Sequence, residues 1–183
     1  MKNQKGFSLI ELLIVVVIIG IIAAIAIPNL LAARRAANEG SAVSSLRTMH
    51  GAQATYQATA GNGDYAGSGA GAVDQVGMTR LNSAGLVDGQ LANGAKSGYA
   101  FTGNNFDHVT GASPTPATFA FRATPQVTAG ITQTGTRDFA IATDGVLSAS
   151  PLVGTGGGII TLGGSAATGA SYSGGAAMAA MGN

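Results

Sequence analysis

Glu11 has the most distinctive chemical setting in the chain, because it is the only side-chain charge in the apolar run from Phe7 to Ala33. A carboxylate inside such a run costs a few kcal/mol on insertion scales unless it is neutralised or paired. A partner arises if the chain is cut between Gly6 and Phe7, because the new α-amino group is largely protonated at neutral pH. The first and fifth residues of one helix lie within a turn of each other, so Phe7 and Glu11 could pair. Such a pair would specify axial register more than it would add stability.

Gly6 stands in an unusual place for a cleavage signal. An ordinary secretory signal carries its small residues after the apolar core and is cut there. Here Gly6 precedes the apolar run and follows a short basic leader, MKNQK. Cleavage after Gly6 would therefore remove the leader and keep the hydrophobic segment in the mature chain.

The segment KGFSLIELLIVVVIIGIIAAIAIP resembles the class III signal of type IV pilins and of the related type II secretion pseudopilins. The resemblance implies that a prepilin peptidase cuts after Gly6 and that the new terminal residue, Phe7, is N-methylated. It also implies that Glu11 of an incoming subunit meets the Phe7 amine of its neighbour in a filament. The alternative is a plain single-span anchor, which explains Glu11 badly.

The apolar run is long enough to span a bilayer. Residues 12–33 are 22 residues without a charge, and at about 1.5 Å each they would cross the hydrocarbon core. The flanking cations are balanced, with Lys2 and Lys5 before the run and Arg34 and Arg35 after it. The positive chain start favours an N-terminus in the cytoplasm. We therefore expect a single-pass protein of the inner membrane that contacts lipid before it assembles.

An amphipathic pattern continues the helix beyond the apolar run. We expect a helix from Phe7 to Ala60 that stops at Gly61, because glycine tolerates the left-handed backbone that ends helices. The apolar first half needs lipid or copies of itself, whereas the second half needs only one covered face. The residues that recur at helical spacing on that face are Ala42, Leu46, Met49, Ala52 and Tyr56.

Two residues interrupt the apolar half of the expected helix. Pro28 removes the hydrogen bond to the carbonyl of Ala24, and Gly20 lowers the local helix propensity. In type IV pilins the matching positions bound a stretch that loosens in the filament. The resemblance therefore predicts that Ile21 to Ile27 is helical in the free subunit and partly melted in the assembled fibre. The alternative is that a membrane helix simply tolerates Gly20 and Pro28 and that these residues have no role in assembly.

Alternating bulky residues predict strands around Tyr99–Phe101, Phe119–Phe121 and Phe139–Ile141. The stretch Thr143–Val146 has the residues of a tight turn between two strands. An antiparallel sheet of about four strands, apolar on one face, could cover the amphipathic half of the helix. The sequence thus predicts an α+β fold, and the resemblance implies the same pilin fold.

The expected parts follow the changes in composition along the chain. They are a leader peptide (1–6), a transmembrane or filament-core helix (7–34), an amphipathic helix (35–60), a head with a connector and a sheet (61–150), and an uncharged tail rich in Gly, Ala, Ser and Thr (151–183). The tail could be a loosely packed terminus, a strand or wrap against a neighbouring subunit, or a glycan acceptor. Within it, Ile159, Ile160 and Leu162 indicate one more strand.

The composition gives no sign of a catalytic or metal site. The chain has no Cys, and its two His residues, His50 and His108, are far apart and are expected to be surface or packing residues. The Asp residues are scattered without the alternation of a calcium loop. The nine Lys and Arg nearly balance the eight Asp and Glu, so DNA binding is not indicated. We expect no cofactor, no metal and no small-molecule substrate.

Two functions share this N-terminus. The first is the major subunit of a type IV pilus, polymerised from copies of itself by an inner-membrane platform with a cytoplasmic ATPase, for adhesion, twitching motility or DNA uptake. The second is the major pseudopilin of a type II secretion system, in a periplasmic fibre. Major pseudopilins typically carry an Asp-Pro-Trp-Gly-like element, and this chain has no Trp. Many type IV pilins carry a C-terminal disulfide loop, which is also missing here. The missing Trp element counts against the pseudopilin, whereas the missing disulfide leaves open only which branch of pilins the chain resembles, so we favour the pilin.

Two further expectations concern the charged residues and a third class of function. Arg34 and Arg35 could meet lipid head groups before assembly. In a filament they could pair with Glu39 of a neighbouring subunit, although a surface pair would contribute little. The third class is a membrane-anchored enzyme or binding domain. It would require a convergent polar site in the head, which the sparse charge disfavours.

Overall fold

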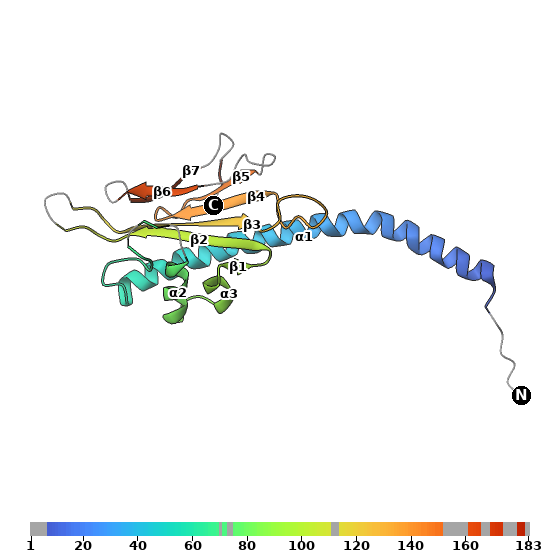
Figure 1. The fold of residues 1–183 in the computed structure, drawn as a ribbon, viewed down its shortest axis with the longest axis horizontal. Helices are drawn as coiled ribbons and strands as arrows, with labels where there is room; N and C mark the ends of the chain where they lie inside the picture. The colour runs from blue at the N-terminus through green and yellow to red at the C-terminus, as the bar shows by residue number, and fades with distance from the viewer. Residues whose placement is uncertain are drawn as a thin grey trace, which may run out of the picture. The chain divides into compact units, whose positions relative to one another are not determined.

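The computed structural model describes residues 7–69, 71–72, 75–110, 114–151, 161–165, 169–173 and 179–181. The chain divides into two compact units, Met1–Arg34 and Arg35–Asn183. We call the second unit the head. Figure 1 shows its elements, a helix, a twisted antiparallel sheet and two short helices at one side of it. The α+β fold expected from the sequence is confirmed.

The first element, α1, is a single helix from Leu9 to Thr59. Its 51 residues would span about 77 Å at 1.5 Å per residue. The helix is continuous through Gly20 and Pro28, as expected for a subunit outside a fibre. It begins two residues later than predicted and ends one residue earlier, because Ser8 precedes the first turn and the chain turns away after Thr59.

The end of α1 corrects the prediction about Gly61. The backbone N–H groups of Ala60 and Gly61 both donate to the Tyr56 carbonyl, at 2.9 and 2.7 Å. The left-handed residues that follow are Asn62, with φ of 50°, and Gly63, with φ of 98°. Gly61 is needed for a different reason, since a Cβ there would lie 2.0 Å from the Asp64 carbonyl oxygen. Close approach of the backbone, rather than a left-handed conformation, therefore accounts for this glycine.

The sheet of the head is antiparallel with the strand order β1-β2-β3-β4-β5-β8. Its four longer strands agree with the prediction, and the two strands at its edges are additional. The turn between β4 and β5 is confirmed, since Ile141 pairs with Leu147 and Gly145 has φ of 74°. The bounds are β1 Ala95–Lys96, β2 Tyr99–Phe106, β3 Thr118–Pro125, β4 Arg137–Ala142, β5 Leu147–Pro151 and β8 Ala179–Ala180.

The core of the head lies between the sheet and the second half of α1. Leu46 and Met49 of the helix are fully buried in one cluster with the rings of β2, β3 and β4. The side chains alternate along a strand, so that Phe119 and Phe121 face the helix while Ala120 faces the other way. The residues that fill this core from the sheet are Tyr99, Phe101, Phe119, Phe121, Ala123, Phe139, Ile141, Leu147 and Ala149.

The opposite face of the sheet is also covered, which the sequence did not predict. A hairpin of β6 (Thr161–Ser165) and β7 (Gly169–Ser173) contacts β2, β3 and β4. Leu162 of β6 packs with Ala120 and Ala142. The expectation of one more strand at Leu162 is met, whereas Ile159 and Ile160 lie outside the described residues. The described tail strands therefore contact their own head.

The connector between α1 and the sheet contains two short helices, α2 (Val76–Ser83) and α3 (Gly89–Ala92). Asp88 caps α3, because its side chain accepts a hydrogen bond from the Leu91 backbone N–H at 2.8 Å. Leu81 and Leu91 are buried in the main core. The apolar side chains of the connector thus reach the core from short helical turns.

Candidate processing and assembly segment

The predicted cleavage site lies at the start of the described chain. Gly6 is outside the described residues, and Phe7, on the other side of the bond, is 82% exposed. The carbonyl of Ser8 accepts hydrogen bonds from the backbone N–H groups of Glu11 and Leu12, at 3.1 and 3.3 Å. Ser8 therefore precedes the first turn of α1, and Phe7 lies outside the helix.

Glu11 lies in the first turn of α1. A negative side chain there is favoured by the helix dipole and by the unpaired N–H groups of the helix start. The order Ser8-x-x-Glu11 is the spacing of a capping box, a signal of a helix start that the sequence prediction overlooked. The Glu11 carboxylate is exposed and forms no hydrogen bond or ion pair with a described residue. Its pairing with the Phe7 amine stays a prediction.

The apolar half of α1 is exposed on all sides. Sixteen large apolar side chains from Phe7 to Leu30 are 50–82% exposed. By length and composition this is a helix that could cross a membrane. A Cβ added to Gly20 would meet nothing within 4 Å, so contacts inside the chain do not require a glycine there. Any requirement for glycine at position 20 would therefore come from its low helix propensity or from contacts with other molecules.

The contacts of Glu39 differ from the prediction that it pairs with Arg34 or Arg35 of a neighbouring subunit. Its side chain is 9% exposed, and its Oε2 accepts hydrogen bonds from Arg137 Nη2 at 2.8 Å and Nε at 3.0 Å. Its Oε1 accepts from the backbone N–H and the hydroxyl of Thr136, both at 2.7 Å. The carboxylate is therefore occupied within its own head, where it fastens α1 to the start of β4.

The neighbourhood of Glu39 sets its protonation. Burial alone would raise the pKa of the Glu39 carboxyl, but the hydrogen bonds from Thr136, followed by those from Arg137, outweigh it and lower that pKa. Beside this pair, the Tyr99 hydroxyl donates to the Arg137 carbonyl at 2.9 Å. Burial, and then the charges of Glu39 and Asp138, raise the pKa of Tyr99. The carboxylate is thus held ionised and the phenol neutral.

The Glu39 pair predicts an acid-sensitive head. The lowered folded-state pKa of Glu39 gives stability that is present above its unfolded pKa, about 4.3, and is lost as pH falls through the folded value. We expect Glu39→Gln to reduce the unfolding free energy at neutral pH by about 1–2 kcal/mol, because Arg137 is half exposed. The same variant should lose less stability than wild type between neutral pH and about pH 3.

Thermal unfolding of the mature chain in detergent, followed by near-ultraviolet circular dichroism, would measure this difference. Asp88→Asn is the matched control, because Asp88 forms an exposed pair with Lys96. We expect a smaller effect from that control, about 0–1 kcal/mol. An equal acid loss in wild type and Glu39→Gln would contradict the role of Glu39.

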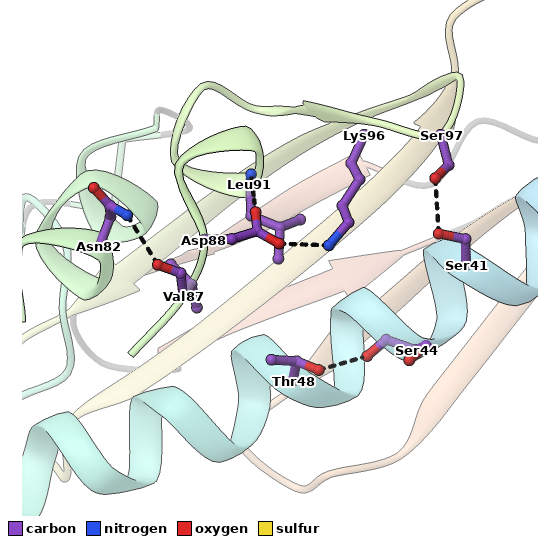
Figure 2. Close-up of polar contacts among 9 residues, drawn as sticks. All are labelled: Ser41, Ser44, Thr48, Asn82, Val87, Asp88, Leu91, Lys96 and Ser97. Atoms are coloured by element: carbon purple, nitrogen blue, oxygen red, sulfur yellow. Dashed lines mark hydrogen bonds and ion pairs between the residues drawn. The ribbon is translucent and has the colours of Figure 1, made fainter. Parts of the chain in front are cut away.

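A surface cleft of about 490 Å³ lies between α1 and the connector. Figure 2 shows its polar contacts, in which Asp88 accepts from Leu91 and Lys96, and the Ser41 hydroxyl lies 2.9 Å from that of Ser97. The hydrogen bond from Lys96, then that from Leu91, lowers the pKa of Asp88. Asp88 and Lys96 are the ionisable groups lining the cleft, and they already pair with each other. The cleft therefore presents hydroxyl groups and no acid–base pair poised for catalysis.

The two histidines lie in separate parts of the head. The ring of His50, on α1, is 5.5 Å from the ring of Phe119. The His108 ring nitrogen Nδ1 is 2.7 Å from Asp64 Oδ1, which also accepts from the His108 backbone N–H. Although burial of Asp64 acts in the opposite direction, these contacts lower the pKa of its carboxyl. Asp64 and His108 thus join the loop after α1 to the end of β2.

Comparison with known proteins agrees with this N-terminal arrangement. Residues 1–27 match the family described as the prokaryotic N-terminal methylation motif. The chain therefore contains a prepilin-type motif. It is similar both to type IV pilins and to type II secretion proteins. No solved structure matches the chain significantly.

Three relatives illustrate that similarity. The type IV wide pilus major component PilA4 of Thermus thermophilus is 54% identical over 57 residues, 31% of this chain and 44% of the relative. The type II secretion system core protein G of Klebsiella pneumoniae is 37% identical over 57 residues, 31% of this chain and 41% of the relative. A fimbrial protein of Pseudomonas aeruginosa is 79% identical over 29 residues, 16% of this chain and 19% of the relative. The chain spans less than half the length of each of these relatives.

Proposed function

We propose that this protein is the major structural subunit of a type IV pilus. A prepilin peptidase removes residues 1–6, and the new terminal residue, Phe7, is N-methylated. Before assembly, the subunit resides in the inner membrane as a single-pass protein. An assembly platform driven by a cytoplasmic ATPase then polymerises it into a surface filament for adhesion, twitching motility or DNA uptake.

The observation that carries this proposal is the uncovered apolar half of α1. Full burial of one large apolar side chain contributes about 1.5–3 kcal/mol. Sixteen such side chains from Phe7 to Leu30 are at least half exposed, so leaving them in water would cost on the order of tens of kcal/mol. Because they surround the helix, one covering face would not suffice. Lipid supplies a complete cover before assembly, and packed copies of the same helix supply one afterwards.

Electron microscopy of filaments sheared from the cell surface, combined with mass spectrometry of their subunit, tests the proposal. We expect filaments whose subunit begins with N-methylated Phe7. Filaments built from a subunit that retains Met1 would contradict the processing step. Absence of this chain from surface filaments under conditions where it is expressed would contradict the pilus itself.

The second candidate function is the major pseudopilin of a type II secretion system. The similarity to the secretion core protein G favours it. The two functions differ in the phenotype of a deletion. Loss of surface filaments with normal protein secretion supports the pilus, whereas retention of exported proteins in the periplasm without loss of surface filaments supports the secretion system.

Assembly should change the helix between Gly20 and Pro28. α1 is helical there in the single chain, but Pro28 cannot donate to the Ala24 carbonyl, and Gly20 costs about 1 kcal/mol of helix propensity relative to Ala. We expect a filament reconstruction by electron cryomicroscopy to show Ile21 to Ile27 partly melted. The double variant Gly20→Ala, Pro28→Ala should restore helix there. Continuous helix in wild-type filaments would refute this prediction.

A further inference from the structure

The loop between β3 and β4, residues 126–136, is fastened to α1 at successive points. Arg35 Nη2 donates to the Gly130 carbonyl at 3.4 Å, and Asn38 Nδ2 donates to the Thr134 carbonyl at 2.9 Å. Glu39 accepts the two hydrogen bonds of Thr136 described above. The three helix residues follow the spacing i, i+3, i+4, so that they share one face of α1. The loop is thus held along the part of the helix where the head begins.

The loop has a defined internal structure as well. The Thr134 backbone N–H donates to the Val127 carbonyl at 3.0 Å, and the Gln133 N–H donates to the Gly130 carbonyl at 3.3 Å. Gly130 has φ of 81°, a left-handed conformation that glycine adopts without strain. These contacts form a hydrogen-bonded turn at the tip of the loop.

The tip presents Ile131, which is 77% exposed. The other large apolar side chains that are exposed in the described part of the head, Val76, Val109, Val127 and Val146, are only 38–43% exposed. A single exposed apolar residue is ordinary on a protein surface. This one, however, stands at the tip of a turn that three polar side chains of α1 hold in place.

We propose that the 126–136 loop rests on the bilayer surface before assembly, with Ile131 inserted at the boundary between head groups and acyl chains. The inference rests on the proposed membrane-anchored subunit. The uncharged run 12–33 would span about 33 Å, close to the roughly 30 Å of a bilayer core. Arg35 is two residues beyond that run and contacts Gly130, the residue before Ile131, so a side chain that closely follows the expected span holds the loop tip.

Charge favours lipid as the occupant over a second copy of the chain. The loop has no charged residue, and the side chain attached to its tip is the cation Arg35. A cationic and apolar surface suits anionic lipid head groups, which attract nearby Arg and Lys side chains. Insertion of one apolar side chain adds to this attraction. The contact would set how the head sits on the membrane before it enters a filament.

Fluorescent probes on single cysteines test this placement, because the natural chain has no cysteine. The full mature chain is reconstituted in vesicles of equimolar phosphatidylcholine and phosphatidylglycerol that contain nitroxide lipids. Three variants carry an environment-sensitive probe: Ile131→Cys at the loop tip, Ile18→Cys in the apolar helix, and Val146→Cys as the matched control. Val146 lies in the turn after β4, at the other end of the strand that the loop precedes.

We expect the probe at 131 to shift to shorter wavelength and to be quenched by nitroxides near the head groups. The probe at 18 should be quenched by deep nitroxides, and the probe at 146 by neither. Asn38→Ala should reduce quenching at 131 when it is added to the Ile131→Cys chain, and it should leave quenching at 18 unchanged when it is added to the Ile18→Cys chain. Quenching at 18 without quenching at 131 would overturn the loop contact alone. Failure at both positions would overturn it together with the membrane anchor. A wavelength shift at 131 without lipid quenching would show that protein covers the tip, which also excludes the proposal.

Discussion

Gly6→Ala is expected to trap the protein as an uncleaved precursor in the membrane and to abolish surface filaments. The substitution adds one methyl group to the residue before the scissile bond. Enzyme pockets discriminate one methyl or methylene group by roughly 10- to 200-fold, so cleaved product should fall by at least about tenfold. The precursor should still insert, because residues 12–33 are unchanged.

Mass spectrometry of the membrane fraction measures this outcome directly. The Gly6→Ala chain should retain Met1, and wild type should begin with N-methylated Phe7. Gln4→Ala is the matched control, because it adds the same residue inside the leader but away from the bond. Normal methyl-Phe termini and normal filaments from Gly6→Ala would show that cleavage does not depend on a glycine at this position.

Three of the four central strands were predictable because they repeat one simple pattern, and the fourth followed from the turn signal at Thr143–Val146. Phe119 and Phe121 alternate with a small residue, and Phe139 and Ile141 do the same. Period-two alternation predicts a strand whichever neighbours it finally meets. The helix was equally accessible, because its apolar and amphipathic halves both follow helical spacing. Local pattern therefore accounts for the α1 core and for most of the sheet.

The features that the sequence did not predict depend on distant contacts. Glu39 looked like a surface charge near Arg34 and Arg35, but its partners are Thr136 and Arg137, 97 and 98 residues away. The β6–β7 hairpin is built mostly of Gly, Ala, Ser and Thr, which give little periodic signal. Such segments pair through their backbone, so only the folded sheet shows where they lie. The role of Gly61 was also hidden, because it follows from the position of the Asp64 carbonyl.

Glu11→Ala and Glu11→Val are expected to leave insertion and cleavage intact while fibre growth falls steeply. In the free subunit the Glu11 carboxylate is exposed in the first turn of α1. It is four residues from the expected new N-terminus, Phe7, so it can lie near the membrane surface. In the proposed fibre we expect the same position to be buried among neighbouring helices. Removing the carboxylate then leaves the Phe7 amine of a neighbour buried without a partner.

Breaking a buried pair by removing one member costs about 3–5 kcal/mol. Because 1.4 kcal/mol is a tenfold change in an equilibrium, each subunit addition should weaken by roughly a hundredfold or more. Glu11→Gln preserves size and should show the same defect if charge is the cause. Filament yield by shearing and quantitative immunoblotting measures the effect, with cleavage checked by mass spectrometry.

A helix-start role for Glu11 is the competing explanation, and Ser8→Ala separates the two. Ser8 precedes the first turn, and its carbonyl already accepts from the Glu11 N–H. If the fibre defect arose from fraying of that turn, Ser8→Ala would reproduce it, and circular dichroism in detergent would show less helix in both variants. We expect instead that Ser8→Ala assembles and that Glu11→Gln does not, with equal helix content. Wild-type fibre yield from Glu11→Gln would remove the basis for the pairing, because the carboxylate's charge is what the neighbouring amine is expected to require.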